Sequence, residues 1–132
     1  MLLLKNLKLQ DFLSHRDSFV TFTENEKLLL DGASGAGKSS VFDGICWCLY
    51  DVSRTDNRSL IRRGQKKATV TLELLRDEET ICITRSITAK GAHTLAVATL
   101  LPTGERIAHP LTGIRPLQEW IEKELIGASY LL

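Results

Sequence analysis

Hydrophobic and polar positions alternate over several stretches of this chain, and each stretch predicts a β-strand. On the first, Leu3, Lys5, Leu7 and Leu9 share one face, so one side of the strand is expected to be buried and the other wetter. The predicted strands are residues 3–10, 18–23, 68–74, 81–87, 94–101 and 106–108. Polar turns separate the later ones, which predicts an antiparallel meander.

Two stretches have helical spacing. From Lys38 to Val52, apolar residues recur on nearly every face, so we expect a helix buried between two layers. A second helix is expected at 116–126, with Pro116 at its start and Gly127 as its stop. We therefore predict an α/β fold with α+β features: a mixed sheet, an antiparallel meander and two helices in a single domain over residues 1–132.

A glycine-rich segment joins a short apolar run at 27–31 to the first predicted helix. It fits G-x-x-x-x-G-K-[ST], the motif of a P-loop NTPase, in the order strand, loop and helix. The predicted nucleotide-binding residues are Gly32, Ala33, Ser34, Gly35, Ala36, Gly37, Lys38, Ser39 and Ser40. The alternative is a glycine-rich turn that only joins a strand to a helix.

Each residue type in this motif has a chemical role toward ATP and magnesium. The glycines let successive backbone N–H groups converge on a phosphate at the positive end of the helix. Lys38 is the candidate catalytic residue, because its charge suits the β- and γ-phosphates. The Ser39 hydroxyl is the expected magnesium ligand, and Ser40 is a further contact to the α-phosphate.

Composition fits an ordinary globular domain, with 43% hydrophobic residues, 25% charged residues and a formal net charge of +1. The apolar runs are too short for a signal peptide or a membrane span, so no membrane partner is expected. Three cysteines, an odd number within apolar patterns, favour reduced core thiols. We therefore expect an intracellular protein, cytoplasmic or nucleoid/nuclear.

A second acidic element of the NTPase site is missing from the sequence pattern. No later apolar run ends in Asp or Glu, although such a residue normally helps to hold magnesium or to polarise the attacking water. The chain also stops at Tyr130-Leu131-Leu132 without a closing turn. We therefore expect the N-terminal piece of a longer ATPase, inactive by itself.

Several segments together carry a family resemblance that covers nearly the whole chain. They are Phe12-Leu13-Ser14-His15, Val20-Thr21-Phe22, residues 28–32 and 35–45 around the P-loop, Leu60-Ile61-Arg62-Arg63-Gly64, residues 68–74 and Leu125-Ile126-Gly127. In this order they resemble the N-terminal ATPase lobe of the SMC-like ATPases, especially the SbcC-type double-strand-break repair branch. The P-loop is common to NTPases, and the flanking segments narrow the resemblance to this family.

The resemblance implies an ABC-type ATPase head that a long coiled coil splits in two. A C-terminal lobe of the same ATPase would supply the signature motif, the acidic strand end and the catalytic Glu. Two heads of a homodimer would enclose two ATP molecules, and their engagement would control binding of double-stranded DNA and a partner nuclease subunit.

Two segments outside the P-loop are also candidate site residues. Ser14, His15 and Arg16 match a segment that lies near the nucleotide in this family, although the family often has Arg or Lys where Leu13 stands and Asn where Ser34 stands. A basic stretch follows the first helix, with Arg62, Arg63, Lys66 and Lys67 as the candidate DNA contacts. The alternative for this stretch is a solvated loop.

The remaining aromatic and imidazole side chains carry simpler expectations. His93 and His109 are expected at the surface, and Trp47 and Trp120 in packing roles. Two other function classes stay open: an ABC transporter nucleotide-binding subunit, and a free-standing P-loop kinase or nucleotide-binding adaptor.

Overall fold

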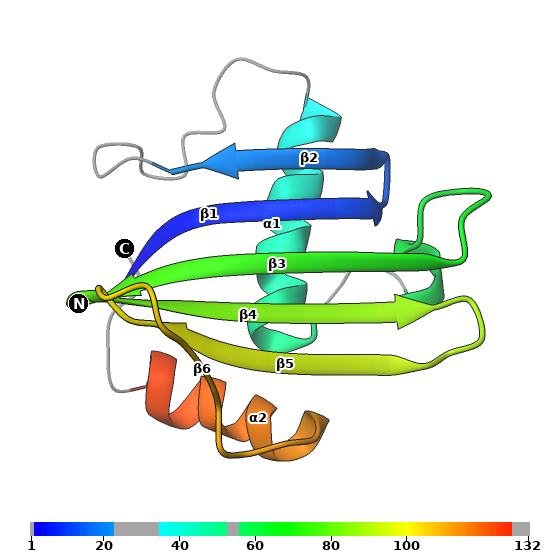
Figure 1. The fold of residues 1–132 in the computed structure, drawn as a ribbon. Helices are drawn as coiled ribbons and strands as arrows, with labels where there is room; N and C mark the ends of the chain where they lie inside the picture. Colours follow the sequence, from blue (N-terminus) through cyan, green and yellow to red (C-terminus); the bar gives the residue numbers. More distant parts are fainter. Residues whose placement is uncertain (1, 23–34, 53–55, 128–132) are drawn as a thin grey trace.

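A six-stranded antiparallel sheet forms the centre of the protein (Figure 1). The computed structural model describes residues 2–22, 35–52 and 56–127, with side chains in the second range from Ser40 onward. The strand order is β2-β1-β3-β4-β5-β6. The strands are β1 (Leu2–Phe12), β2 (His15–Thr21), β3 (Lys67–Arg76), β4 (Glu79–Thr88), β5 (His93–Leu100) and β6 (Arg106–Ala108).

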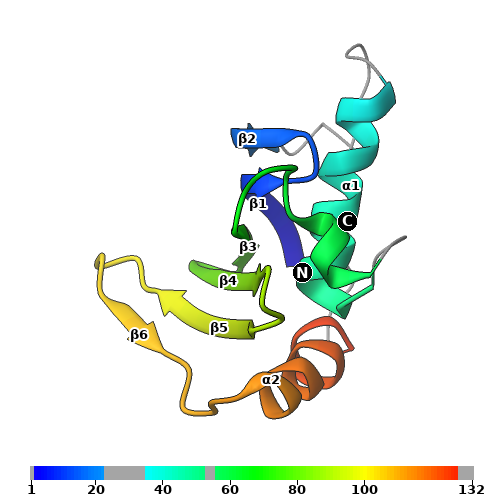
Figure 2. The ribbon, with the colours of Figure 1, turned by 90° about the vertical axis from the view of Figure 1, so that its right-hand side faces the viewer.

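The helices lie against one face and one edge of this sheet. The long helix α1 (Gly35–Tyr50) runs across the strands, from the β2 side to the β5 side (Figures 1 and 2). Helix α2 (Ile114–Trp120) contacts β5 and continues as the π-helical turn η2 (Ile121–Ile126), which contacts α1. A short 3-10 helix, η1 (Asn57–Leu60), follows α1.

Most predicted strands are confirmed, and the alternation of β3 is confirmed residue by residue. Ala68, Val70, Leu72 and Leu74 are fully buried and face α1. On β4 the same inward face holds Ile81, Ile83 and Ile87, together with the buried Arg85. Trp47 fills the space between α1 and this face, which confirms its packing role.

The predicted alternation of β1 is wrong at its start. Leu2 and Leu4 are buried instead of Leu3, and a bulge between Leu4 and Asn6 shifts the register against β3. Beyond the bulge, Leu7 and Leu9 are buried as expected. A bulge inserts one residue and so moves the following side chains to the other face.

The helix boundaries differ from the predicted ones by a few residues. Helix α1 begins at Gly35 rather than Lys38, and α2 begins at Ile114 rather than Pro116. The second helix is α-helical only to Trp120, and its last part is the π-helical η2, which ends before Gly127. All strand pairs in the described sheet are antiparallel. The run at 27–31, on which the prediction of a mixed sheet depends, lies outside the described residues.

Helix α1 is covered on one side, not on two as its apolar pattern predicts. Val41, Ile45 and Leu49 are buried toward the sheet, whereas the exposed fractions of Phe42, Tyr50 and the following Val52 are 50%, 37% and 59%. Phe42 and Tyr50 are eight residues apart and therefore lie on one face of the helix. The described residues supply a layer on the sheet side of α1 only, which leaves this apolar face uncovered.

Candidate nucleotide-binding site

The phosphate-binding motif leads into the N-terminal end of α1. Gly32, Ala33 and Ser34 lie outside the described residues, and the next five motif residues begin the helix. The first amides of any helix lack intrahelical partners and carry a partial positive charge. The first turn of α1 contains no acidic residue that would neutralise this end. The N-terminus of α1 therefore fits an anionic phosphate supplied by a ligand.

Close packing against β1 positions this helix. A methyl group at Gly44 would lie 2.7 Å from Leu9 Cδ2 and 3.6 Å from Leu7 Cδ2, which is too close for the first contact. Because glycine has no Cβ, α1 can approach β1 more closely than another residue would allow. Ser40, the last of the predicted nucleotide contacts, is buried near the start of the helix.

The segment with Ser14, His15 and Arg16 forms the turn between β1 and β2 and the start of β2. Phe12 pairs with His15, so the turn has two residues, with Leu13 in the left-handed region at φ +52° and Ser14 exposed. His15 is half-buried and its Nδ1 lies 2.8 Å from Ser18 Oγ. Burial lowers the pKa of His15, which favours the neutral imidazole at neutral pH.

The basic stretch is attached to this same turn by backbone hydrogen bonds. Leu13 N–H donates to the Leu60 carbonyl at 2.7 Å, and Arg62 N–H donates to the Asp11 carbonyl at 2.7 Å. The side chains of Arg62 and Asp11 form an ion pair, with Arg62 Nε 3.0 Å from Asp11 Oδ1. The chain segments that carry Arg16 and Arg62, far apart in sequence, therefore meet at one end of the sheet.

An open hollow of about 510 Å³ lies where these two segments meet. Its lining residues are Gln10, Asp11, Arg16, Asp17, Arg62 and Gln65. Two arginines face two aspartates there, so the lining has balanced formal charge. The hollow joins a predicted nucleotide contact, Arg16, to a predicted DNA contact, Arg62.

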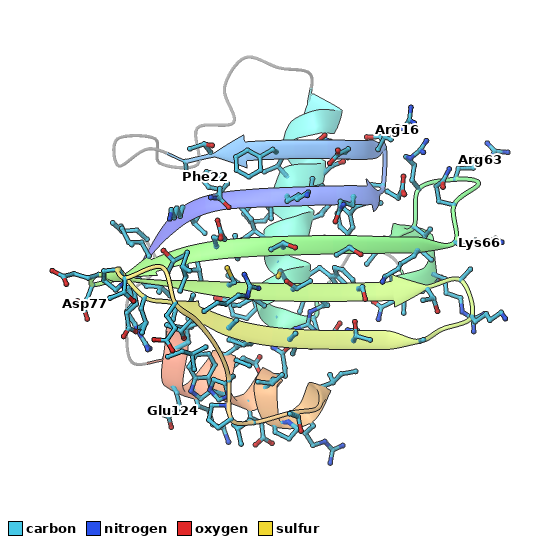
Figure 3. The ribbon with its side chains drawn as sticks, viewed as in Figure 1. Arg16, Phe22, Arg63, Lys66, Asp77 and Glu124 are labelled. Atoms are coloured by element: carbon cyan, nitrogen blue, oxygen red, sulfur yellow. The ribbon has the colours of Figure 1, made fainter. Side chains whose placement is uncertain are left out.

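The other predicted DNA contacts are close in sequence to Arg62 and Gln65, which line this hollow. Arg63, Lys66 and Lys67 are exposed, and Figure 3 shows Arg63 and Lys66 at the same end of the sheet as Arg16. Asp77 lies at the opposite end, in the turn between β3 and β4. Since Arg62 is paired with Asp11, the exposed Arg63, Lys66 and Lys67 are the three better placed to meet phosphates; their contact with DNA stays a prediction.

The two histidines expected at the surface are half-buried instead. The ring of His93 stacks on Trp47, with 5.9 Å between centroids, and its Nε2 lies 3.1 Å from Arg85 Nη1. The ring of His109 is tilted against Trp120 at 4.4 Å. Burial lowers the pKa of both histidines, and the charge of Arg85 lowers that of His93 further. Their partners are distant in sequence, which is why residue spacing did not predict these contacts.

The three cysteines are free, as expected of reduced thiols. Burial raises the pKa of Cys48 to about 12, and burial together with the nearby Glu73 carboxylate raises that of Cys82 to about 11. Both side chains therefore stay protonated at neutral pH and pack as small apolar groups. Within the described ranges, no helix is long and apolar enough to cross a membrane.

Sequence reasoning did not assign a role to one buried residue, Arg85. It falls on the apolar face of β4 between Ile83 and Ile87, and it is fully buried. A charged residue at an inward position of an alternating strand is the signal that marks it, because such residues are almost never fully buried unless they are paired.

Comparison with known proteins agrees with the interpretation of the phosphate-binding motif. The family described as "AAA domain" matches residues 6–123. The DNA double-strand break repair Rad50 ATPase of Thermoplasma acidophilum is 30% identical over 129 residues, which cover 97% of this chain and 14% of that protein. The protein of the same name from Saccharolobus solfataricus is 40% identical over 82 residues, covering 61% of this chain and 9% of that protein.

Solved structures with low sequence identity share the fold. The recombination mediator protein RecF of the RecFOR pathway matches with a TM-score of 0.63 at 16% identity, covering 80% of this chain and 28% of that chain. The SMC head domain from Thermotoga maritima matches with a TM-score of 0.54 at 24% identity, covering 79% of this chain and 38% of that chain.

These likenesses bear out the P-loop, ABC-type fold inferred from the sequence. The chain spans about 14% of the length of the Thermoplasma acidophilum relative. The chain belongs to the AAA-domain family, and the relatives that it resembles over a small part of their length are double-strand break repair ATPases.

Proposed function

We propose that this chain is the single-domain, ATP-binding N-terminal lobe of an SMC-like ATPase that acts in DNA double-strand-break repair or recombination. The observation that carries the proposal is that α1 begins inside a complete G-x-x-x-x-G-K-[ST] motif and has no acidic residue in its first turn. The likeness to double-strand break repair Rad50 ATPases, over 97% of this chain in one case, favours this function over an ABC transporter subunit or a free-standing kinase or adaptor.

The proposed site divides the work among neighbouring residues. The backbone of Gly32–Gly37 cradles phosphate oxygens, Lys38 meets the β- and γ-phosphates, and Ser40 meets the α-phosphate. Ser39 holds magnesium, which neutralises phosphate charge when it is bound. Ser14 in the β1–β2 turn and His15 and Arg16 at the start of β2 are further proposed nucleotide contacts.

This lobe is proposed to need a C-terminal lobe for ATP turnover. None of the strands in the described part of the chain ends in an acidic residue that would help to activate water. The uncovered apolar face of α1, with Phe42 and Tyr50, is a suitable contact for that second lobe. The relatives are several times longer than this chain, which leaves ample length for such a lobe.

Head dimerisation, a partner nuclease and DNA binding complete the proposal. The first two rest on the resemblance to SMC-like ATPases. DNA binding has additional support from the exposed Arg63, Lys66 and Lys67 at one end of the sheet. A DNA repair role implies an intracellular protein, in the cytoplasm or in the nucleoid or nucleus.

Calorimetric titration of the full chain with ATP and Mg²⁺ tests the nucleotide site. Lys38→Ala is expected to weaken binding by about 10- to 100-fold, because a hydrogen bond to a charged group contributes about 1.5–3 kcal/mol. Lys90→Ala, in the turn between β4 and β5, is the matched control and is expected to bind like the wild type. Equal ATP affinity in all three proteins would overturn the assignment of Lys38.

A further inference from the structure

Arg85 on β4 is the one charged side chain with no solvent exposure among the described residues. Removing a guanidinium from water is costly unless its donors find acceptors. The Arg85 side chain points toward the C-terminal end of α1, where its Nη2 donates a hydrogen bond to the Cys48 carbonyl at 3.1 Å. The buried guanidinium therefore interacts with the C-terminal end of α1.

Further groups surround this guanidinium, although its Nε is buried without a hydrogen-bond partner among the described residues. Arg85 Nη1 donates to His93 Nε2 at 3.1 Å, and Asp51 Oδ1 lies 3.9 Å from the same Nη1. The guanidinium carbon lies 5.9 Å from the centroid of the Trp47 ring, within the range of a cation–π contact. Strands β4 and β5 and the end of α1 thus meet around one cation.

The end of α1 requires partners from elsewhere in the chain. The last four carbonyls of a helix have no intrahelical donors and carry a partial negative charge. The last turn of α1 has no basic residue, and Asp51 follows it in the left-handed conformation at φ +56°. Arg85 supplies both the missing donor and the positive charge.

Gln118 on α2 joins this cluster with both ends of its amide. Its Oε1 accepts a hydrogen bond from Arg85 Nη2, and its Nε2 donates to the Leu49 carbonyl at 2.8 Å. The last turn of α1 is thus capped by one side chain from the sheet and one from α2. Figure 2 shows this end of α1 beside α2, while its other end lies toward β2.

We propose that Arg85 is a positioning residue that clamps the C-terminal end of α1 to α2 through Gln118. Because α1 begins in the phosphate-binding motif and α2 leads to the chain beyond residue 127, the clamp makes these two regions move as one unit. This inference deepens the proposed function and rests on it for the nucleotide part. It predicts that ATP bound at the start of α1 slows amide hydrogen exchange in α2 of the same chain.

Amide hydrogen exchange of the full chain, with and without ATP and Mg²⁺, tests the clamp. Gln118→Met removes the link to α2 while Arg85 still reaches the Cys48 carbonyl. Without ligand, we expect exchange to rise about fivefold in both the last turn of α1 and in α2, the effect of losing about one hydrogen bond. Arg115→Met, at an exposed position of α2, is the matched control and should leave both unchanged.

Adding ATP then distinguishes a clamp between α1 and α2 from a general stabilisation of the two helices. In the wild type, ATP is expected to slow exchange in both α1 and α2. In Gln118→Met, ATP is expected to slow exchange in α1 alone. Arg85→Met is a second variant, expected to lose the protection at both helix ends; if it does not fold, Gln118→Met still decides the question.

The possible failures are distinguishable. If ATP slows α2 exchange equally in Gln118→Met and wild type, the clamp is refuted and the nucleotide site stands. If the wild type binds no ATP, the proposed function fails, and the ligand-free comparison judges the clamp. A rise confined to α2 in Gln118→Met, with the end of α1 unchanged, would refute the clamp in that case.

Discussion

Replacing Gly44 by Ala tests the close approach of α1 to β1, which fixes where the phosphate-binding end of the helix lies. In a helix interior, Ala is favoured over Gly by about 1 kcal/mol. Against this gain, the new methyl group would lie 2.7 Å from Leu9 Cδ2 and 3.7 Å from Phe12 Cε2. The balance between these two effects decides whether Gly44→Ala stabilises or destabilises the protein.

The clash is expected to dominate. Leu9 is fully buried, so its terminal methyl cannot move into solvent to make room. Overpacking of this kind costs about 1–3 kcal/mol, which leaves Gly44→Ala destabilised by about 0–2 kcal/mol after the helix gain. A loss of about 1 kcal/mol corresponds to a fall in Tm of about 3–5 °C in a domain of this size.

Urea unfolding of four proteins measures the effect as a double-mutant cycle. In a Leu9→Ala background the clashing methyl is absent, so Gly44→Ala should become stabilising by about 1 kcal/mol. Leu9→Ala alone provides the reference, with an expected loss of about 2–5 kcal/mol. If Gly44→Ala stabilises the wild type by about 1 kcal/mol, or acts equally in both backgrounds, the close approach of α1 to β1 is refuted.

Three further predictions concern pH, DNA and the second lobe. Burial and Arg85 lower the pKa of His93 in the folded protein, so on acidification the His93 of the unfolded chain binds a proton before that of the folded chain. The free energy of unfolding therefore falls as pH drops below about 6.5. His93→Gln should flatten that fall in urea midpoints between pH 7.5 and 5, and an unchanged slope would contradict it. The triple variant Arg63→Ala/Lys66→Ala/Lys67→Ala should weaken duplex DNA binding and lower its salt slope by about 2–3; Arg115→Ala/Lys123→Ala is the control, and an unaltered slope would remove the DNA assignment. Phe42→Ala should weaken docking of a separately purified C-terminal lobe by about 2.5 kcal/mol, since about 100 Å² of a half-exposed phenyl would be covered. The control is Phe19→Ala on β2, where the side chain is still more exposed (64%); this variant should bind normally, and equal losses would argue against α1 as the contact.

Much of the fold follows from local patterns. The period of two across 68–74 and 81–87 gave β3 and β4 with their inward faces, because the side-chain alternation of a strand is fixed by geometry. The switch of the buried side chains to the other face along β1 could not be predicted from local patterns, because the bulge near Lys5 is defined by pairing with β3 rather than by local sequence.

The candidate site was likewise predictable from the sequence only in part. The motif located the start of α1, because phosphate chemistry demands those residue types in a fixed spacing. The ion pair of Arg62 with Asp11 joins residues 51 apart, and the contact of Gln118 with Leu49 joins residues 69 apart. Such contacts depend on the assembled fold, and no periodicity in the sequence reports them.

ATP turnover by this chain, alone and mixed with a C-terminal lobe of an SMC-like ATPase, tests the central claim most directly. We predict magnesium-dependent hydrolysis only in the mixture, and its loss when Lys38→Ala replaces the wild-type chain, because the groups that activate water belong to the second lobe. Sustained hydrolysis by the chain alone, abolished by Lys38→Ala, would contradict the account and show that the chain contains its own catalytic acid.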